Sequence, residues 1–237
     1  MPAIEPHSES QPMVSVSKGN LMDFLVRLPA LMIGLFLFAV GVVANLNSGL
    51  GMSPWGVLNV GVSNMTPLTL GQASQVIGLV VIAVGWALGF APGFGTLMNM
   101  YFIGLFIDLI VAWGLIPIPT EPIFQYLLLI LSVAILGVGS LFYMGVQLGA
   151  GPRDGLMLSL VKKMGKQVAY VRAGIEGTVL VLGYLLGGPV GIGTVITALT
   201  TGYSVQLFFR LGEFDSKSKQ LNLYELYQWL SGRSDRP

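Results

Sequence analysis

A long stretch without positive charge is the strongest constraint on the fold. Between Leu28 and Pro152 the chain contains no Lys or Arg, and its only acidic residues there are Asp108 and Glu121. Such a stretch cannot stay in water, and it is too long for one buried core helix. Soluble domains carry roughly 25% charged residues, whereas this chain carries 10%. The sequence therefore predicts an integral membrane protein in contact with a lipid bilayer.

The residue types that most enzymes and nucleic-acid-binding proteins need are scarce. The chain has no Cys, and its one His is His7, so the usual ligands of zinc, haem and iron–sulfur clusters are missing, as are thiol and Ser–His–Asp catalysis. The net charge of +1 provides no basic field for nucleic acid. An intramembrane aspartyl protease needs two embedded aspartates, and only Asp108 qualifies. We therefore expect no enzyme activity, no cofactor, no metal and no nucleic-acid partner.

Six segments are apolar enough to cross a bilayer core of about 30 Å, which takes around 20 residues per helix. They are residues 28–48, 72–90, 95–116, 123–146, 168–187 and 190–210. Two further stretches, 54–66 and 152–164, have the pattern of helices about 20 Å long. They are too short to cross and are expected to be re-entrant or to lie flat at the interface.

The two ends of the chain are expected to lie outside the bilayer. Residues 1–27 are predicted to be a disordered cytoplasmic tail because their first part is polar and contains prolines. Residues 213–237 form a second predicted tail. Its LNLYELYQWL segment has the polar stripe of an amphipathic helix in the headgroup zone. A helix that docks onto a partner protein is the alternative.

Positive residues predict the orientation. The loops at 48–71, 116–122 and 187–190 contain no Lys or Arg. With six crossings every basic group falls on one side of the membrane, which predicts that both termini are cytoplasmic. An eight-span arrangement, in which both short stretches cross fully, leaves only Arg153 on the other side and remains an alternative.

The chain repeats itself at an offset of 98 residues. The Gly-Phe-Gly-Thr run at 93–96 recurs as Gly-Ile-Gly-Thr at 191–194, and Leu-Gly-Met-Ser-Pro at 50–54 recurs as Leu-Gly-Ala-Gly-Pro at 148–152. Each copy holds one span, one short helix that starts with proline, and two more spans. Three crossings per copy is an odd number, so the second copy must enter the membrane from the opposite face.

We therefore predict an all-α integral membrane protein built as a 3+3 inverted repeat, with repeat 1 at 28–118 and repeat 2 at 119–212. Inverted repeats of this kind are common in transporters.

Three runs of sequence resemble a known family. They are Leu-Gly-Met-Ser-Pro-Trp-Gly at 50–56, Gly-Phe-Gly-Thr leading to Ile107-Asp108, and Gly-Ala-Gly-Pro-Arg-Asp-Gly-Leu-Met at 149–157. They resemble the YczE-like proteins of the YczE/YyaS/YitT group of bacterial multi-pass membrane proteins. Members of this family often have Asp after the Pro-Trp pair, where this chain has Gly56, and this departure argues against paired carboxylates in the two loops. The resemblance implies a bacterial cytoplasmic-membrane protein and implies no particular substrate.

The two short helices offer a candidate anion site. Proline suits the first helical position, and the residue before it, Ser53 or Gly151, suits the cap. If the preceding loops run into the bilayer and the helices return to their side of entry, both positive N-termini point towards the midplane. Arg153 follows the second proline, where a cation opposes the helix dipole, so it is a candidate ligand for an anion. Asp154 either belongs to the same site or only stabilises the start of the helix.

Asp108 is the other prominent candidate. It lies inside the third predicted span, about 12 Å below the outer surface, where a charge costs up to about 3 kcal/mol. It is expected to carry a proton, contact a cation or pair with Arg153, and a hydrogen-bonded structural aspartate is the alternative. Arg172 and Glu176 lie four residues apart and predict an intrahelical ion pair.

The predicted function is that of a small secondary transporter or permease for a small polar or anionic solute, with a site between the two repeats near the midplane. The candidate solute-binding residues are Asp108, Arg153, Asp154, Ser53, Pro54, Trp55, Asn99, Thr197 and Gln206. The alternative is a non-transporting membrane scaffold or accessory protein that acts through its cytoplasmic surface. A homo-oligomer or a protein partner is compatible with both.

Overall fold

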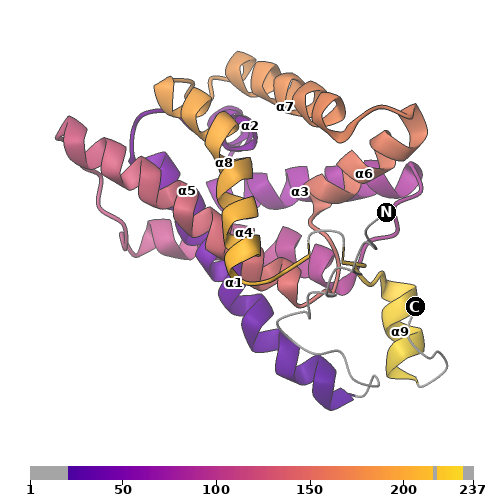
Figure 1. Cartoon of the computed structure of the whole chain (residues 1–237). Helices are drawn as coiled ribbons and strands as arrows, with labels where there is room; N and C mark the ends of the chain where they lie inside the picture. The colour runs from indigo at the N-terminus through magenta and orange to yellow at the C-terminus, as the bar shows by residue number, and fades with distance from the viewer. Residues whose placement is uncertain (1–20, 216–217, 232–237) are drawn as a thin grey trace, which may run out of the picture.

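A computed structural model describes residues 21–215 and 218–231, and this part of the chain folds into nine α-helices with no strand (Figure 1). The all-α prediction is confirmed. The predicted tail at residues 1–20 and the last residues, 232–237, lie outside the described part.

Six helices are long and apolar enough to cross a membrane. They are α1 (Leu21–Asn47), α3 (Leu70–Ala87), α4 (Phe94–Ala112), α5 (Pro122–Gly145), α7 (Val168–Leu185) and α8 (Ile192–Leu211). The two short helices are α2 (Pro54–Met65) and α6 (Pro152–Met164), of 12 and 13 residues. The ninth is α9 (Leu223–Leu230), inside the segment where an amphipathic helix is predicted. The predicted spans agree with the long helices apart from a few residues at their ends.

The largest difference is at α1, which begins at Leu21 rather than at residue 28 and continues through Arg27. Arg27 is 1% exposed. Its guanidinium donates a hydrogen bond of 2.9 Å to the carbonyl of Val146 and lies 5.1 Å from the ring centroid of Trp229 in α9. Because the guanidinium is bonded and covered inside the protein, the helix does not need to end before it. The predicted boundary at residue 28 therefore lies too far along the chain.

The antiparallel helices α1 and α5 form the centre of the molecule. Glycines bring their backbones together: a Cβ on Gly34 would lie 2.5 Å from the backbone nitrogen of Tyr143, and one on Gly41 would lie 2.7 Å from Leu136 Cγ. Small residues at such contacts allow the close packing on which helix association in lipid depends. The helix α4 packs on α1, and α8 packs on α5.

Each short helix packs against a long helix from the other half of the chain. α2 packs along α7, and α6 packs along α3. A Cβ on Gly61 would lie 2.9 Å from Leu186 Cβ, and Gly85 faces Leu156 at ordinary contact distance. The two halves are therefore interlocked rather than placed side by side.

The long-helix pairs of the two halves differ. α3 lies tightly against α4, where a Cβ on Gly78 would lie 2.8 Å from Met100 Cγ. α7 and α8 barely touch: no neighbour lies within 4 Å of a Cβ added to Gly174 or Gly177, and Gly202 meets only the guanidinium of Arg172 at 3.8 Å. One helix pair is closed and the other is open.

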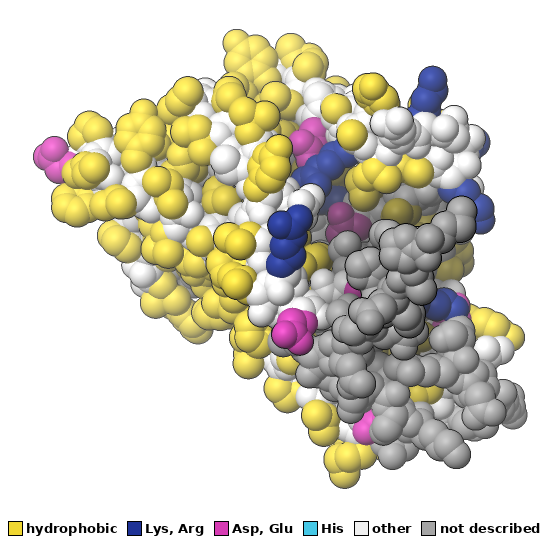
Figure 2. Space-filling view, viewed as in Figure 1, with side chains coloured by type: hydrophobic (Ala, Val, Ile, Leu, Met, Phe, Trp, Pro, Cys, Tyr) yellow, Lys and Arg dark blue, Asp and Glu magenta, His cyan; other side chains and the backbone are white. Residues whose placement is uncertain are grey.

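Charged side chains are concentrated at one end of the molecule. On the face shown in Figure 2, the dark-blue Lys and Arg side chains gather in the centre and on the right, towards the region of α6 and α9, while the left-hand part around the start of α5 is almost wholly apolar. An apolar band with a basic end is the surface expected for a protein that sits in a bilayer.

Candidate functional site at the junction of the two short helices

A side-chain contact connects the beginnings of the two short helices. Trp55 is the second residue of α2 and Arg153 is the second residue of α6, and the Arg153 Cζ lies 4.7 Å from the centroid of the Trp55 ring. Trp55 is 8% exposed. The first turns of the two helices are therefore linked by this contact between side chains.

The loop before α2 is held by hydrogen bonds from other elements. Asn45 of α1 accepts a bond of 3.0 Å from the backbone nitrogen of Ser53, and the Ser53 hydroxyl oxygen accepts one of 3.4 Å from Gly56 N. Met52 N donates to the carbonyl of Pro189 at 3.3 Å. These bonds fix the non-helical backbone that leads into α2.

The loop before α6 is held in a similar way. Thr96 of α4 donates a 2.6 Å bond to the carbonyl of Ala150, and the Thr96 oxygen accepts a 3.0 Å bond from Gly93 N. The cap residue Gly151 has no capping side chain of its own, and the hydroxyl of buried Tyr143 lies against it, 2.6 Å from where a Cβ would be. The first turn of α6 therefore starts beside a phenol rather than beside apolar carbon.

Two matched backbone hydrogen bonds hold the loops that precede α2 and α6, here called the entry loops. Each bond joins one entry loop to a long helix from the other half of the chain. Gly95 N donates to the Leu148 carbonyl and Gly193 N donates to the Leu50 carbonyl, both at 2.7 Å. Donors and acceptors alike are related by the 98-residue offset. The glycines that follow the two acceptors, Gly51 and Gly149, both have positive φ, at 100° and 130°. The two loops therefore share one backbone conformation and one kind of anchor.

The electrostatics of the junction centre on Arg153. Among the described residues its guanidinium makes no ion pair and no hydrogen bond, and its close contact is the Trp55 ring. The charges that act on it most strongly are those of Asp154 and Glu176. Glu176 is bonded to Arg172 at 2.8 Å, so the predicted ion pair is confirmed. Asp154 is exposed. Arg153 is therefore a cation without a bonded counter-ion.

Asp108 lies elsewhere. Its Oδ2 accepts a 2.6 Å bond from the Thr69 hydroxyl and its Oδ1 accepts a 2.8 Å bond from Gly71 N, both at the start of α3. Both carboxylate oxygens thus cap a helix N-terminus, as the helix dipole favours. The structure gives this residue the contacts of a hydrogen-bonded structural aspartate and no contact with Arg153.

The remaining predicted site residues are dispersed. Thr197 is fully buried and donates to the Gly193 carbonyl of its own helix at 2.8 Å. Asn99 is half-buried in α4 and Gln206 is exposed on α8, and neither side chain makes a hydrogen bond to a described residue. The junction therefore brings together Ser53, Pro54, Trp55, Arg153 and Asp154 from the predicted set.

Sequence reasoning missed two residues of the junction. Thr96 belongs to the Gly-x-Gly-Thr run that occurs in both repeats. The second copy makes the matching bond, in which Gly191 N donates to the Thr194 hydroxyl oxygen at 3.1 Å. The recurrence of the threonine in both copies was the signal that could have identified Thr96. Tyr143 lies in the last turn of α5 and is buried. Nothing in the sequence near Tyr143 indicates that its hydroxyl reaches Gly151.

Six apolar helices around the meeting point of two half-length helices define a multi-pass helical membrane protein. Residues 25–210 match the family described as "Family of unknown function (DUF6198)", and the chain belongs to this family, in the YczE-like group that its sequence motifs indicate.

Three relatives place the chain further. The uncharacterized membrane protein YczE of Bacillus subtilis is 37% identical over 173 residues, which cover 71% of this chain and 79% of the relative. An uncharacterized protein of Haemophilus influenzae is 36% identical over 164 residues, 69% of this chain and 74% of the relative. The uncharacterized protein YyaS of Bacillus subtilis is 26% identical over 208 residues, 79% and 96% of the two chains. No solved structure matches the chain.

Proposed function

We propose that this protein is a small secondary transporter whose solute, a small polar molecule with an anionic group, binds at the junction of α2 and α6. The observation that carries the proposal is Arg153, which has no bonded counter-ion among the described residues and lies against Trp55. A cation in the first turn is repelled by the positive end of the helix dipole. An anion bound there would pair with Arg153 and would also be attracted by the helix end. The planar guanidinium matches a carboxylate or phosphate group.

An inverted repeat explains why the two first turns meet. Trp55 and Arg153 are related by the 98-residue offset, and a residue pair of this kind can touch only close to the axis that relates the repeats. The matched bonds Gly95–Leu148 and Gly193–Leu50 support the same axis. With the axis in the membrane plane, α2 and α6 are re-entrant from opposite faces and their N-termini lie near the midplane, where transporters of this architecture bind solutes.

The difference between the two long-helix pairs supports alternating access. α3 packs closely on α4, whereas α7 is separated from α8. Arg172 and Glu176 lie on α7 beside this separation. If the two repeats exchange conformations, α7 closes on α8 and α3 opens from α4. Gln206, the repeat partner of Asp108, then lies where it can cap α7 at Gln167, the repeat partner of Thr69.

The proposed setting is the bacterial cytoplasmic membrane with both termini in the cytoplasm. The matching relatives are bacterial, and one is named a membrane protein. The described Lys and Arg residues belong to the start of α1, to α6 and the start of α7, and to the end of α8 and the segment after it. This grouping at one end follows the positive-inside rule.

A second candidate function rests on α9. Its Leu226 and Trp229 are buried against α1, which leaves Tyr224 and Tyr227 exposed at 69% and 59% on the outer face. A scaffold or accessory protein would use this face to hold a partner. The variant Tyr224→Ser/Tyr227→Ser should then abolish function in cells while leaving solute binding and melting temperature unchanged.

The transporter proposal is tested with the full-length protein in detergent, by melting it against small carboxylates, phosphate esters, amines and zwitterions. A ligand at 100 times its Kd adds about 2.7 kcal/mol to the free energy of unfolding. We expect an anionic solute to stabilise the wild type and the control Arg210→Ala but not Arg153→Ala. Stabilisation that survives in Arg153→Ala contradicts the site, and a solute that binds but shows no counterflow in proteoliposomes contradicts transport.

A further inference from the structure

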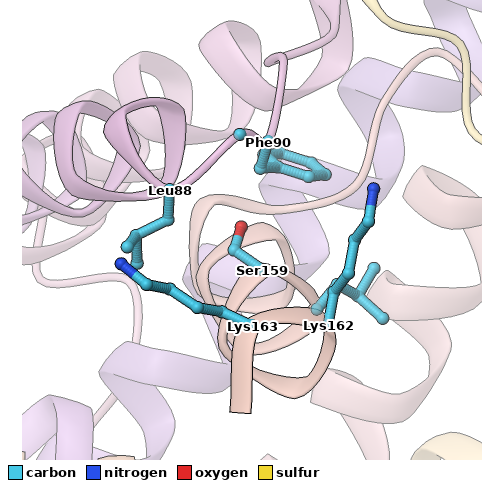
Figure 3. A pocket seen from close by; sticks show the side chains of 7 residues that line it. Leu88, Phe90, Ser159, Lys162 and Lys163 are labelled. Atoms are coloured by element: carbon cyan, nitrogen blue, oxygen red, sulfur yellow. The ribbon is translucent and has the colours of Figure 1, made fainter. Parts of the chain in front are cut away.

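A hollow lies away from the junction, where the end of α3 meets the end of α6. It is a cavity of about 480 Å³ between Leu88 and Phe90 on one side and Ser159, Lys162 and Lys163 on the other (Figure 3). None of these residues takes part in the contact between Trp55 and Arg153. The cavity therefore needs its own explanation.

Two lysines flank this cavity. In Figure 3 the ammonium groups of Lys162 and Lys163 extend on either side of Ser159, one towards Leu88 and the other beside Phe90. Among the described residues no carboxylate forms an ion pair with either lysine. Both belong to the last turn of α6, whose dipole supplies only about half a negative charge. The two ammonium charges of Lys162 and Lys163 are therefore larger than the partial negative charge at the end of α6.

The serine between the lysines is already engaged. The Ser159 hydroxyl donates a 2.8 Å bond to the Gly155 carbonyl of its own helix. The lysines are consequently the donors that the cavity offers to a ligand, and ammonium donors fit phosphate oxygens.

The other wall is apolar and continues onto the outer surface of α3. Leu88 and Phe90 line the cavity, and Val80, Val84 and Trp86 are exposed on the helix that leads to it. On the other side of the α6 end, Lys166 and Tyr170 line a second hollow of about 370 Å³. Lysine beside exposed Trp and Tyr at the end of apolar helices is the composition of the membrane interface.

We infer that this cavity binds the phosphate group of an anionic phospholipid from the leaflet that surrounds the basic end of the molecule. Lys162 and Lys163 donate to the phosphate oxygens, and the glycerol and first acyl carbons lie on Leu88 and Phe90. Basic pockets between membrane helices on the cytoplasmic side bind anionic headgroups in this way. A free phosphate ion satisfies the lysines but leaves the apolar wall unused, which favours the lipid.

The test uses the full-length protein in neutral detergent, with the melting temperature followed while phosphatidylglycerol, phosphatidylcholine or inorganic phosphate is added. We expect phosphatidylglycerol alone to raise it. In Lys162→Gln/Lys163→Gln the apparent affinity for phosphatidylglycerol should fall at least about tenfold. The control Lys166→Gln/Arg210→Gln removes the same charge outside this cavity and should keep the effect.

Every other outcome counts against the lipid site. Equal loss in both double variants indicates general attraction between charges, and an equal shift with inorganic phosphate indicates a free anion.

A melting temperature of Lys162→Gln/Lys163→Gln near that of the wild type before lipid is added shows that the variant is folded. The site is independent of the proposed transport, because Arg153→Ala should keep the phosphatidylglycerol effect and Lys162→Gln/Lys163→Gln should keep the solute effect.

Discussion

The guanidinium of Arg153 lies over the indole of Trp55, 4.7 Å from the ring centroid, and joins the first turns of two helices that are 98 residues apart in the chain. A contact of this kind is worth about 0.5–2 kcal/mol. The cation is thus held in place without a carboxylate that a solute would have to displace.

The first prediction concerns this contact. Trp55→Leu should lower the free energy of unfolding by about 2–4 kcal/mol through lost packing and the lost ring, and Trp55→Phe should cost less. A double-mutant cycle with Arg153→Met, measured by unfolding in detergent, should give a coupling of about 0.5–2 kcal/mol. Additive effects of the two substitutions would mean that the contact contributes nothing.

The second prediction concerns the glycines of the entry loops. Gly51 and Gly149 have positive φ, and a Cβ on Gly51 would lie 2.5 Å from Gly191 N, while one on Gly149 would lie 2.7 Å from Gly93 Cα. Gly51→Ala and Gly149→Ala should each cost about 3 kcal/mol or more, from backbone strain and the clash together. The matched control is Gly114→Ala, which has a φ of 61° and no neighbour within 4 Å of the added Cβ. It should cost only about 1 kcal/mol. Equal losses in the three variants would contradict the close approach.

The third prediction separates capping from proton transfer at Asp108. Because both of its oxygens accept bonds at the start of α3, Asp108→Ala should destabilise the protein by about 1–2 kcal/mol. Asp108→Asn keeps one acceptor and should lose less. Solute uptake into proteoliposomes should persist in Asp108→Asn. If uptake stops in a variant that melts normally, the carboxylate carries a proton and capping is not its whole role.

The fourth prediction concerns the open helix pair. The chain has no native Cys, so every thiol in a double-Cys variant is introduced. In Gly78→Cys/Met100→Cys the two Cβ atoms would lie 3.5 Å apart, within disulfide range. The repeat-related pair Glu176→Cys/Ala198→Cys should form a disulfide only when α7 closes on α8. We expect cross-linking of this second pair to rise with a bound solute, followed by gel shift. If Gly78→Cys/Met100→Cys forms its disulfide but Glu176→Cys/Ala198→Cys never does, the proposal that α7 closes on α8 is contradicted.

The fifth prediction is a pH dependence of α9 docking. Burial alone would raise the pKa of Glu225, but its hydrogen bonds with Lys219 and with the backbone at Asn222 outweigh burial and lower it. A lowered folded-state pKa contributes stability that is present above the unfolded value, about 4.3, and is lost as the pH falls through the folded value. The melting temperature should therefore fall more steeply in acid for the wild type than for Glu225→Gln. Parallel curves would show that the carboxylate contributes nothing.

Much of the architecture was accessible from the sequence because it depends on local composition. A run of about 20 apolar residues is long enough to cross the bilayer whatever it later contacts, and a proline after Ser53 or Gly151 suits the first position of a helix. The ion pair of Arg172 and Glu176 was equally predictable, since four residues of one helix bring the two charges together. The family followed from short runs of residues that keep their order.

The tertiary structure decided what those elements do to one another. The charge of Arg27 predicts the end of a membrane helix, whereas the structure buries this side chain against Val146 and Trp229. An acid inside a span predicts function until Thr69 and Gly71 engage both oxygens of Asp108. Trp55 and Arg153 meet only because helices from the two halves interlock. Hydropathy and helix breaking act along a few turns of chain, whereas these contacts depend on how whole helices pack, which no local pattern encodes.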